Sequence, residues 1–166
     1  LYVKFHEEAK KNPSLEDQAR EEFRKLEEGD KENRKLWEWF RRESLREVHK
    51  MYELLGVRFT TFIGESFFEG EMKPLVRRLL RAGVAKRSEG SVIVPLDGQK
   101  LPPALIEKSD GASLYLTRDI ANLRYRIKTY RPAKILYVVG NEQSLHFEQL
   151  FAIAKLLKLD VSKLVH

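Results

Sequence analysis

The most informative side chains in this sequence are a phenol, a carboxylate and an amide that together suit one small cation. Tyr115 and Asp119 lie four residues apart at the end of the stretch Lys108–Asp119, and Gln143 follows the next apolar run of the chain. A carboxylate can accept two parallel hydrogen bonds from a guanidinium group, and a crevice that holds little water strengthens this pairing. The phenol and the amide can complete the recognition of such a planar group. These residue types predict a site for a small polar ligand that carries positive charge.

The elements expected around Asp119 leave a structural role open. The branched and aromatic side chains at Leu114–Leu116 favour a short strand, and Thr117 can cap a helix that begins at Arg118. Asp119 then lies in the first turn of this helix, where unpaired N–H groups and the helix dipole stabilise a carboxylate without any ligand. Acidic residues are common in such positions. Taken alone, Asp119 fits the role of an acidic residue that stabilises the start of a helix better than a role in ligand binding.

A second strand end is expected to bring further polar groups to the same place. Ile135–Val139 is a continuous apolar run, typical of a parallel strand covered on both faces, and Gly140–Gln143 turns it into another helix. A strand–helix–strand unit with the usual right-handed crossover places Tyr115 and Asp119 beside that turn. Ligands bind at this edge of open α/β sheets. The crossover therefore favours the binding role of Asp119.

Two further side chains near this edge are ambiguous. Asp110 precedes Gly111, where a turn-stabilising role is at least as well supported as a binding role. His146 lies one helical turn after Gln143 and can touch the crevice, although a single histidine on a helix is more often structural. The other histidines are scattered, without the spacing of metal ligands. The sequence contains neither a P-loop nor a Gly-x-Gly-x-x-Gly motif.

The first 56 residues have the pattern of charged amphipathic helices. Ser14 begins a capping-box sequence, Gly29 supplies a left-handed helix end, and Asp30 can cap the helix that follows. A second capping-box sequence at Ser44 predicts a break or kink there, and Gly56 ends the last helix.

The character of the chain changes after these helices. Val57–Thr61 alternates apolar and polar residues, which predicts a half-buried strand. A helix is expected over Glu71–Ala82, followed by a hairpin formed by Val84–Arg87 and Val92–Leu96. The sequence therefore predicts an α/β part with a small antiparallel flap, preceded by helices.

Composition limits the class of protein. The chain has 166 residues, 42% of them hydrophobic, which is enough to bury a core. It contains no cysteine, so disulfides and thiolate metal sites are excluded, and no transmembrane span or signal peptide is visible, which predicts a cytosolic location. The net charge of +6 favours association with a polyanion such as nucleic acid. Because both signs are interleaved, however, much of this charge has the pattern of a solvated helix face.

Several segments resemble one known family, the arginyl-tRNA synthetases. The resemblance covers nearly the whole chain in one order, which makes it specific. It implies a partial Rossmann-like class I synthetase core over residues 45–166, in which parallel strands and helices carry a small antiparallel flap. It also implies an N-terminal helical insertion over residues 1–44. The similar segments are Lys108–Ala121, Tyr137–Phe147, Phe5–Ala9, Leu26–Asp30, Leu36–Trp37 and Gly64–Ser66.

The resemblance also implies a function and roles for four residues. Members of this family activate L-arginine with ATP, assisted by Mg²⁺, and charge tRNA(Arg) with it. Tyr115 and Asp119 match the family's pair that holds the substrate guanidinium, and Gln143 matches a glutamine that helps to bind arginine. His146 matches a histidine that neighbours the active site. No tightly bound cofactor, structural metal or membrane partner is expected. The expected location is the cytoplasm, and the sequence leaves the oligomeric state open, with a monomer favoured.

The chain also departs from the family pattern. It contains neither the His-Ile-Gly-His-type signature nor the Lys-Met-Ser-Lys-type loop that handle ATP, and no anticodon-binding domain. We therefore expect an internal fragment that supplies the arginine side-chain pocket, has no catalytic residues of its own and is inactive by itself. The alternative is a non-catalytic synthetase-like module that binds tRNA or protein through the basic helices of residues 20–50.

Overall fold

The structure, a computed structural model, describes residues 1–112 and 114–166. These residues form two compact units, Leu1–Phe62 and Ile63–His166. The two compact units divide after Phe62, and residues 44 and 45, between which the domain boundary was predicted, both lie in α3 (Lys31–Leu54). The assignment of residues 1–44 to an insertion in a larger core stays a prediction.

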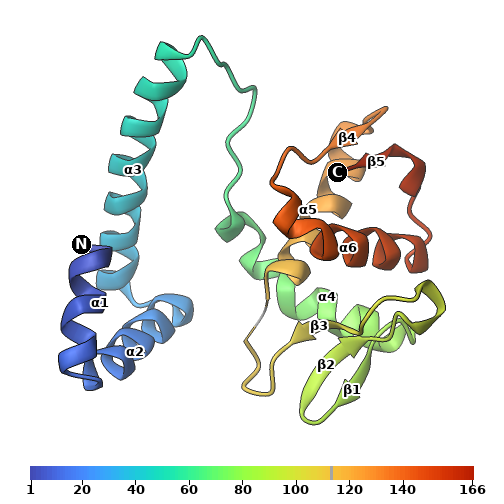
Figure 1. Cartoon of the computed structure of the whole chain (residues 1–166), viewed down its shortest axis with the longest axis horizontal. Helices are drawn as coiled ribbons and strands as arrows, with labels where there is room; N and C mark the ends of the chain where they lie inside the picture. Colours follow the sequence, from blue (N-terminus) through green and yellow to red (C-terminus); the bar gives the residue numbers. More distant parts are fainter. Residues whose placement is uncertain (113) are drawn as a thin grey trace. The chain divides into compact units, whose positions relative to one another are not determined.

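Helices make up most of the N-terminal unit. They are α1 (Tyr2–Lys11), α2 (Ser14–Glu28) and α3 (Lys31–Leu54) (Figure 1). Gly29 follows α2 with a φ of 89°, the left-handed geometry expected at a helix end. The side chain of Asp30 caps α3, because it accepts hydrogen bonds from the backbone N–H groups of Glu32 and Asn33. Both expected signals are confirmed.

Two other expected helix signals in this unit are wrong. Ser14 is the first residue of α2 rather than its cap, and its hydroxyl donates to Oδ1 of Asn12 over 2.8 Å. The break expected at Ser44 does not form, because α3 passes through this residue. Just beyond it, Glu47 and Lys50 form an ion pair of 2.8 Å at a spacing of three residues, which favours the continuous helix.

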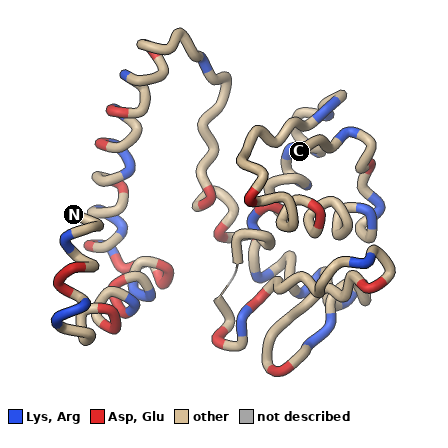
Figure 2. The backbone as a smooth tube through the Cα atoms, in the orientation of Figure 1, with Lys and Arg blue, Asp and Glu red and all other residues tan. Residues whose placement is uncertain are grey.

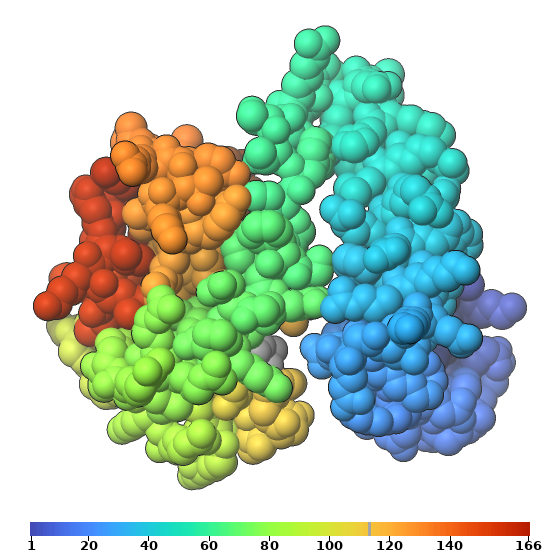
Figure 3. Space-filling view, turned by 180° about the vertical axis from the view of Figure 1, so that it is seen from behind, coloured from blue at the N-terminus to red at the C-terminus, as the bar shows by residue number. Residues whose placement is uncertain are grey.

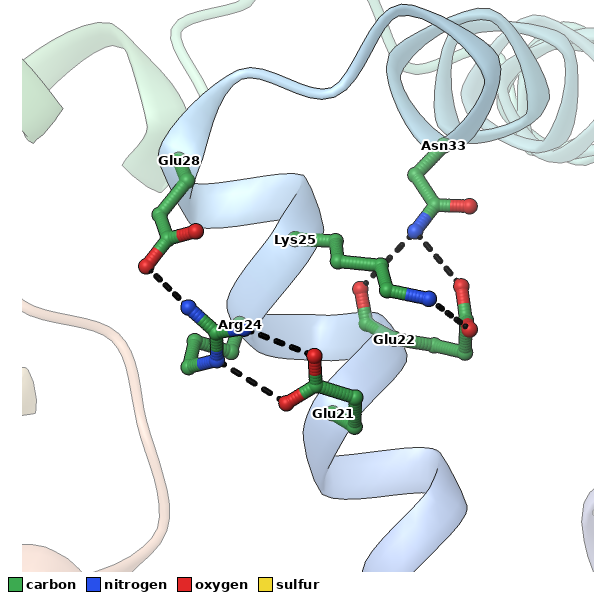
Figure 4. Close-up of polar contacts among 6 residues, drawn as sticks. All are labelled: Glu21, Glu22, Arg24, Lys25, Glu28 and Asn33. Atoms are coloured by element: carbon green, nitrogen blue, oxygen red, sulfur yellow. Dashed lines mark hydrogen bonds and ion pairs between the residues drawn. The ribbon is translucent and has the colours of Figure 1, made fainter.

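Polar side chains connect α2 to the start of α3 (Figure 4). Nδ2 of Asn33 donates to the backbone carbonyl of Glu22 over 3.0 Å and to its Oε2 over 2.8 Å. Arg24 pairs with Glu21 and Glu28 on α2 itself. Exposed pairs of this kind contribute little to stability, so the bond of Asn33 across the two helices is the more informative contact. Along both helices, charges of the two signs are interleaved (Figure 2), as expected from the sequence.

Residues 57–62 form no strand, so the strand expected at Val57–Thr61 is wrong. Its aromatic side chains pack against α3 instead. The ring centroid of Phe59 lies 4.7 Å from that of Tyr52, and the ring centroid of Phe62 lies 4.7 Å from that of His49. Phe59 and Phe62 therefore make edge-on aromatic contacts with α3, without a partner strand, and both stay about half exposed.

The first half of the C-terminal unit contains an antiparallel sheet. A short 3-10 helix, η1 (Glu65–Phe68), leads into α4 (Glu69–Arg81). The strands β1 (Lys86–Ser88), β2 (Ser91–Val94) and β3 (Ala104–Glu107) follow, in the sheet order β1-β2-β3. Glu89 and Gly90 join the first two strands with φ values of 48° and 80°, the left-handed geometry of a two-residue hairpin turn. The expected hairpin is confirmed, and β3 extends it.

The second half of this unit contains two helices and a short parallel sheet. The elements are α5 (Tyr115–Tyr130), β4 (Ile135–Leu136), α6 (Ser144–Leu156) and β5 (Leu164–Val165). Strand β4 pairs in parallel with β5, and the register aligns Ile135 with Leu164. The 3-10 helices η3 (Asn141–Gln143) and η4 (Val161–Lys163) flank α6, and η2 (Asp97–Gln99) lies between β2 and β3. The strand–helix–strand unit is therefore β4–α6–β5.

No strand forms at Leu114–Leu116, so this expectation is wrong. Helix α5 already begins at Tyr115. Leu116, Ile120 and Leu123 are buried at helical spacing, which extends the core-facing stripe of α5 back to its first turn. The helical period of these apolar residues outweighs the strand propensity of three of them. The expected parallel partner of β4 is therefore replaced by β5.

The core of the C-terminal unit lies between α4, the three-stranded sheet, α5 and α6. Figure 3 shows one face of this packing, where α4 (green) lies beside the end of α5 (orange). Thr117 is fully buried, and its hydroxyl donates to the carbonyl of Ile106 over 2.5 Å. Thr117 therefore anchors α5 to β3 rather than capping the helix. None of the described helices has both the length and the apolar composition that crossing a membrane requires.

Candidate functional site

Tyr115 and Asp119 lie one turn apart on α5, not at the end of a strand. Side chains four residues apart share one face of a helix, so the phenol and the carboxylate are presented together. Tyr115 is 66% exposed, and the side chain of Asp119 is 32% exposed. The first turn of α5 contains no acidic residue, so the expectation that Asp119 is a first-turn acid is wrong. The helix-start explanation for its carboxylate therefore does not apply.

The carboxylate of Asp119 contacts the imidazole of His146. Nε2 of His146 lies 2.6 Å from Oδ2 of Asp119, which joins α5 to the first turn of α6. The side chain of His146 is 26% exposed, so solvent screens this contact only in part. Across residues 1–112 and 114–166, Oδ1 of Asp119 has no hydrogen-bond partner. One of the two carboxylate oxygens is therefore open to further hydrogen bonds.

Tyr137, which follows β4, adds a buried phenol to the neighbourhood of Asp119. Within the described part of the chain, its hydroxyl is buried and forms no hydrogen bond of ordinary geometry, although the Arg126 guanidinium lies close enough to interact with it. Burial raises the pKa of this phenol above its ordinary value, the nearby Arg126 guanidinium opposes the rise, and the Asp119 carboxylate adds to it. The guanidinium carbon of Arg126 lies 5.6 Å from the centroid of the Tyr137 ring. The phenol is therefore held neutral beside the carboxylate.

Replacing Tyr137 by phenylalanine is expected to raise the free energy of unfolding at pH 7 by about 1 kcal/mol, because the change removes a buried hydroxyl that forms no hydrogen bond of ordinary geometry. Its raised pKa means that the folded protein keeps the phenol proton to higher pH than the unfolded chain. The free energy of unfolding of the wild type should therefore fall as the pH rises above about 10. The free energy of unfolding of Tyr137→Phe should fall less than that of the wild type over the same pH range. Urea denaturation between pH 7 and 11 measures both effects.

Tyr130 provides the matched control for this change, because it is an exposed tyrosine on α5. Tyr130→Phe should leave the free energy of unfolding at pH 7 within about 0.5 kcal/mol of the wild type. If Tyr137→Phe and Tyr130→Phe showed the same dependence on pH, the burial of the Tyr137 hydroxyl would have no energetic effect.

Gln143 lies at the end of η3, directly before α6. It is exposed, and its backbone N–H donates to the carbonyl of Gly140 over 3.1 Å. Its side chain makes no hydrogen bond to any other residue that the structure describes. The structure thus brings His146 and Asp119 into contact. Gln143 precedes His146 by three residues in the sequence and makes no contact with Asp119 among the described hydrogen bonds.

A charged pair beside Tyr115 was not indicated by the sequence pattern. Nη1 of Arg118 lies 3.5 Å from Oε2 of Glu65, and the guanidinium carbon of Arg118 lies 5.7 Å from the centroid of the Tyr115 ring. The side chain of Arg118 is largely buried, whereas that of Glu65 is exposed. Glu65 and Arg118 are far apart in the sequence, so no local spacing connects them. The only sequence signal at Glu65 is the similarity of the Gly64–Ser66 segment to a known family.

Asp110 does not belong to this group of side chains. Its Oδ1 accepts a hydrogen bond of 2.9 Å from the backbone N–H of Ala112, which closes a turn around Gly111. The turn-stabilising interpretation of Asp110 is therefore the one that its geometry supports. In the described ranges, no three histidine or acidic side chains gather closely enough to hold a metal ion.

The fold and the sequence define the class of this protein. A family model described as tRNA synthetases class I (R), catalytic domain, matches residues 1–166. The chain therefore belongs to the family of class I tRNA synthetase catalytic domains of this (R) type.

Two similar relatives specify the family further. The chain is 53% identical to the arginine–tRNA ligase of Enterococcus faecalis over 98% of its length, and 51% identical to that of an Exiguobacterium species over 96%. The expected resemblance to arginyl-tRNA synthetases is confirmed. The chain spans only 29% of the length of each of these two relatives.

A solved structure supports the fold. The crystal structure of arginyl-tRNA synthetase from Plasmodium falciparum superimposes with a TM-score of 0.78 at 23% identity, covering 93% of this chain and 28% of that chain. A putative arginyl-tRNA synthetase from Campylobacter jejuni gives a TM-score of 0.72 at 16% identity, over 90% of this chain and 33% of that one. The mixed α/β class is thus confirmed as a class I synthetase fold.

Proposed function

We propose that this chain is the part of an arginine–tRNA ligase that holds the side chain of L-arginine. The carrying observation is the partly buried carboxylate of Asp119, which has one oxygen without a partner among the described residues and lies one turn from the exposed phenol of Tyr115. Each carboxylate oxygen can accept more than one hydrogen bond, so the contact with His146 leaves room for a ligand that donates two. Gln143 is the proposed third contact, at the start of the neighbouring helix.

The geometry of the acceptors favours a guanidinium over an ammonium. A guanidinium is planar and presents its N–H donors in a fixed fork, which matches a carboxylate edge. An ammonium is a compact charge that is more strongly hydrated, so it loses more on entering a partly dry site. The proposed pocket should therefore discriminate arginine from lysine, although both carry one positive charge.

In the whole ligase, L-arginine would be activated with ATP, assisted by Mg²⁺, and transferred to tRNA(Arg) in the cytoplasm. The partial Rossmann-like core and the helical insertion belong to the same proposal. In the described ranges the residues form no cluster of metal-ligating side chains, and the sequence carries no glycine-rich phosphate-binding motif. We therefore assign no residue of this chain to ATP or Mg²⁺, and we assign arginine recognition to Tyr115, Asp119 and Gln143.

Isothermal titration of the 166-residue chain with L-arginine and L-lysine tests the proposed pocket. We expect arginine to bind at least about tenfold more tightly than lysine, because only the guanidinium can pair with the carboxylate in two parallel bonds. Circular dichroism before the titration establishes that the chain is folded. Equal affinity for the two amino acids, or no heat with arginine in a folded sample, would contradict the proposal.

Pyrophosphate exchange with ATP and arginine should be undetectable, since no ATP-handling signature occurs in the sequence.

A further inference from the structure

The contact between His146 and Asp119 connects two helices that the sequence separates by a strand and a turn. Asp119 lies in the second turn of α5, His146 lies in the first turn of α6, and Nε2 and Oδ2 are 2.6 Å apart. This distance is slightly shorter than that of most hydrogen bonds between an N–H group and a charged oxygen, so the two groups are in direct contact.

We propose that His146 is a positioning residue, which holds the Asp119 carboxylate in the orientation that a ligand guanidinium requires. The inference rests on the proposed function, because it assigns a role to His146 within the same arginine site. A neutral imidazole that donates from Nε2 fixes Oδ2 and, through the planar carboxylate, also fixes the direction of Oδ1. Without this donor, the carboxylate would have to be ordered when the ligand binds.

Aromatic packing holds the start of the helix that carries the imidazole. The adjacent Phe147 is buried, and its ring stacks on His166 at a centroid distance of 4.6 Å and contacts Tyr137 at 4.7 Å. The ring of His146 meets that of Phe147 edge-on at 5.1 Å. Phe147 therefore packs the first turn of α6 against Tyr137 and His166, and this turn carries the imidazole of His146.

The start of α6 is also fixed by a local hydrogen bond. The hydroxyl of Ser144 donates to the carbonyl of Asn141 over 2.6 Å, which ties the first turn of α6 to η3. Gln143 lies inside this closed turn. The proposed amide contact and the imidazole are therefore presented by the same short, tied segment, and His146 links that segment to the carboxylate on α5.

Substitutions that separate hydrogen bonding from side-chain size test this role. His146→Ala is expected to weaken arginine binding by about tenfold, the value of one hydrogen bond to a charged group. His146→Gln places an amide donor near the position of Nε2, so it should restore binding to within about threefold of the wild type. His49→Ala, a histidine of α3 in the N-terminal unit, is the matched control and should leave arginine binding unchanged.

A second measurement does not require arginine. Long-range ¹H–¹⁵N spectra of the imidazoles should show the neutral His146 ring protonated at Nε2 in the wild type. In Asp119→Asn this preference should weaken, because the charged acceptor is gone. The His49 signals should be the same in both proteins. If His146→Ala does not fold, these spectra and the Gln variant still decide the question.

The outcomes distinguish the two proposals. If the wild type binds arginine with the expected selectivity but His146→Ala binds it equally well, the positioning role is wrong and the arginine site stands. An Nδ1-protonated ring in the wild type would also overturn the positioning role. If the folded wild type binds no arginine, the proposed function fails, and the positioning role fails with it.

Discussion

Asp119→Asn is expected to weaken the binding of L-arginine to this chain by at least about 30-fold. Removing one partner of a partly buried charge pair costs about 2 kcal/mol or more. Asparagine keeps the size of the side chain, but it loses the negative charge and presents an NH₂ group that cannot accept from a guanidinium. Isothermal titration measures the loss directly. Because Asp119 is partly exposed and lies on the surface of α5, the variant should fold like the wild type.

Asp110→Asn is the matched control for this prediction. Asp110 carries the same carboxylate nine residues earlier, but its Oδ1 accepts from the backbone N–H of Ala112 in a turn, where asparagine can take its place. Arginine affinity should therefore stay within about twofold of the wild type. If both variants lost affinity equally, the loss would reflect the net charge of the chain. An unchanged affinity in Asp119→Asn would remove Asp119 from the proposed pocket.

Thr117→Val is expected to lower the free energy of unfolding by about 1–3 kcal/mol. Valine has nearly the same shape as threonine, so no cavity forms, but the fully buried hydroxyl that donates to the Ile106 carbonyl is lost. The loss removes the polar bond between α5 and β3. Urea denaturation measures the change, and an unaltered slope against urea would show that the unfolded state is unaffected.

Thr129 supplies the comparison on the same helix, because it is exposed near the end of α5. Thr129→Val should change the free energy of unfolding by no more than about 0.5 kcal/mol. Thr117→Ser, which keeps the hydroxyl, should retain more stability than Thr117→Val. The opposite order would mean that the buried methyl group, rather than the hydrogen bond, stabilises this position.

The sequence predicts those parts of the fold that depend on neighbouring residues. The cap of α3 at Asp30 and the left-handed end of α2 at Gly29 follow from side-chain and backbone geometry within a few residues. The hairpin through Glu89 and Gly90 is equally local. These features could be predicted because each one depends on only a few consecutive residues.

The wrong predictions arose where packing across the chain decides between two local patterns. Leu114–Leu116 suits a strand by composition, but Leu116 and Ile120 share one buried face of a helix. Val57–Thr61 alternates like a strand, but the structure offers it an aromatic surface on α3 and no partner strand. In both cases the partner surface, which the local sequence does not contain, determines the backbone conformation.

The candidate site was predictable in its residue types and only in part in its geometry. Tyr115, Asp119 and Gln143 were predicted from their chemistry and from the expected strand ends, with His146 as an ambiguous neighbour, and the family resemblance then assigned a role to each of the four residues. The pair of Arg118 with Glu65 and the buried phenol of Tyr137 depend on contacts between distant segments of the C-terminal unit. No sequence spacing reports such contacts, so they required the structure.

The placement of Tyr115 and Asp119 on one helix gives the site one fixed dimension. Four residues of α-helix advance about 6 Å, and a helix in the core is too stiff to change this rise. Any displacement of α5 therefore moves the phenol and the carboxylate together. Gln143 and His146, by contrast, lie at the start of α6, so only the separation of the two helices can adapt to a ligand. In the proposed pocket, a guanidinium would therefore meet two contacts of fixed spacing on α5. Its contacts with α6 would depend on the separation of the two helices.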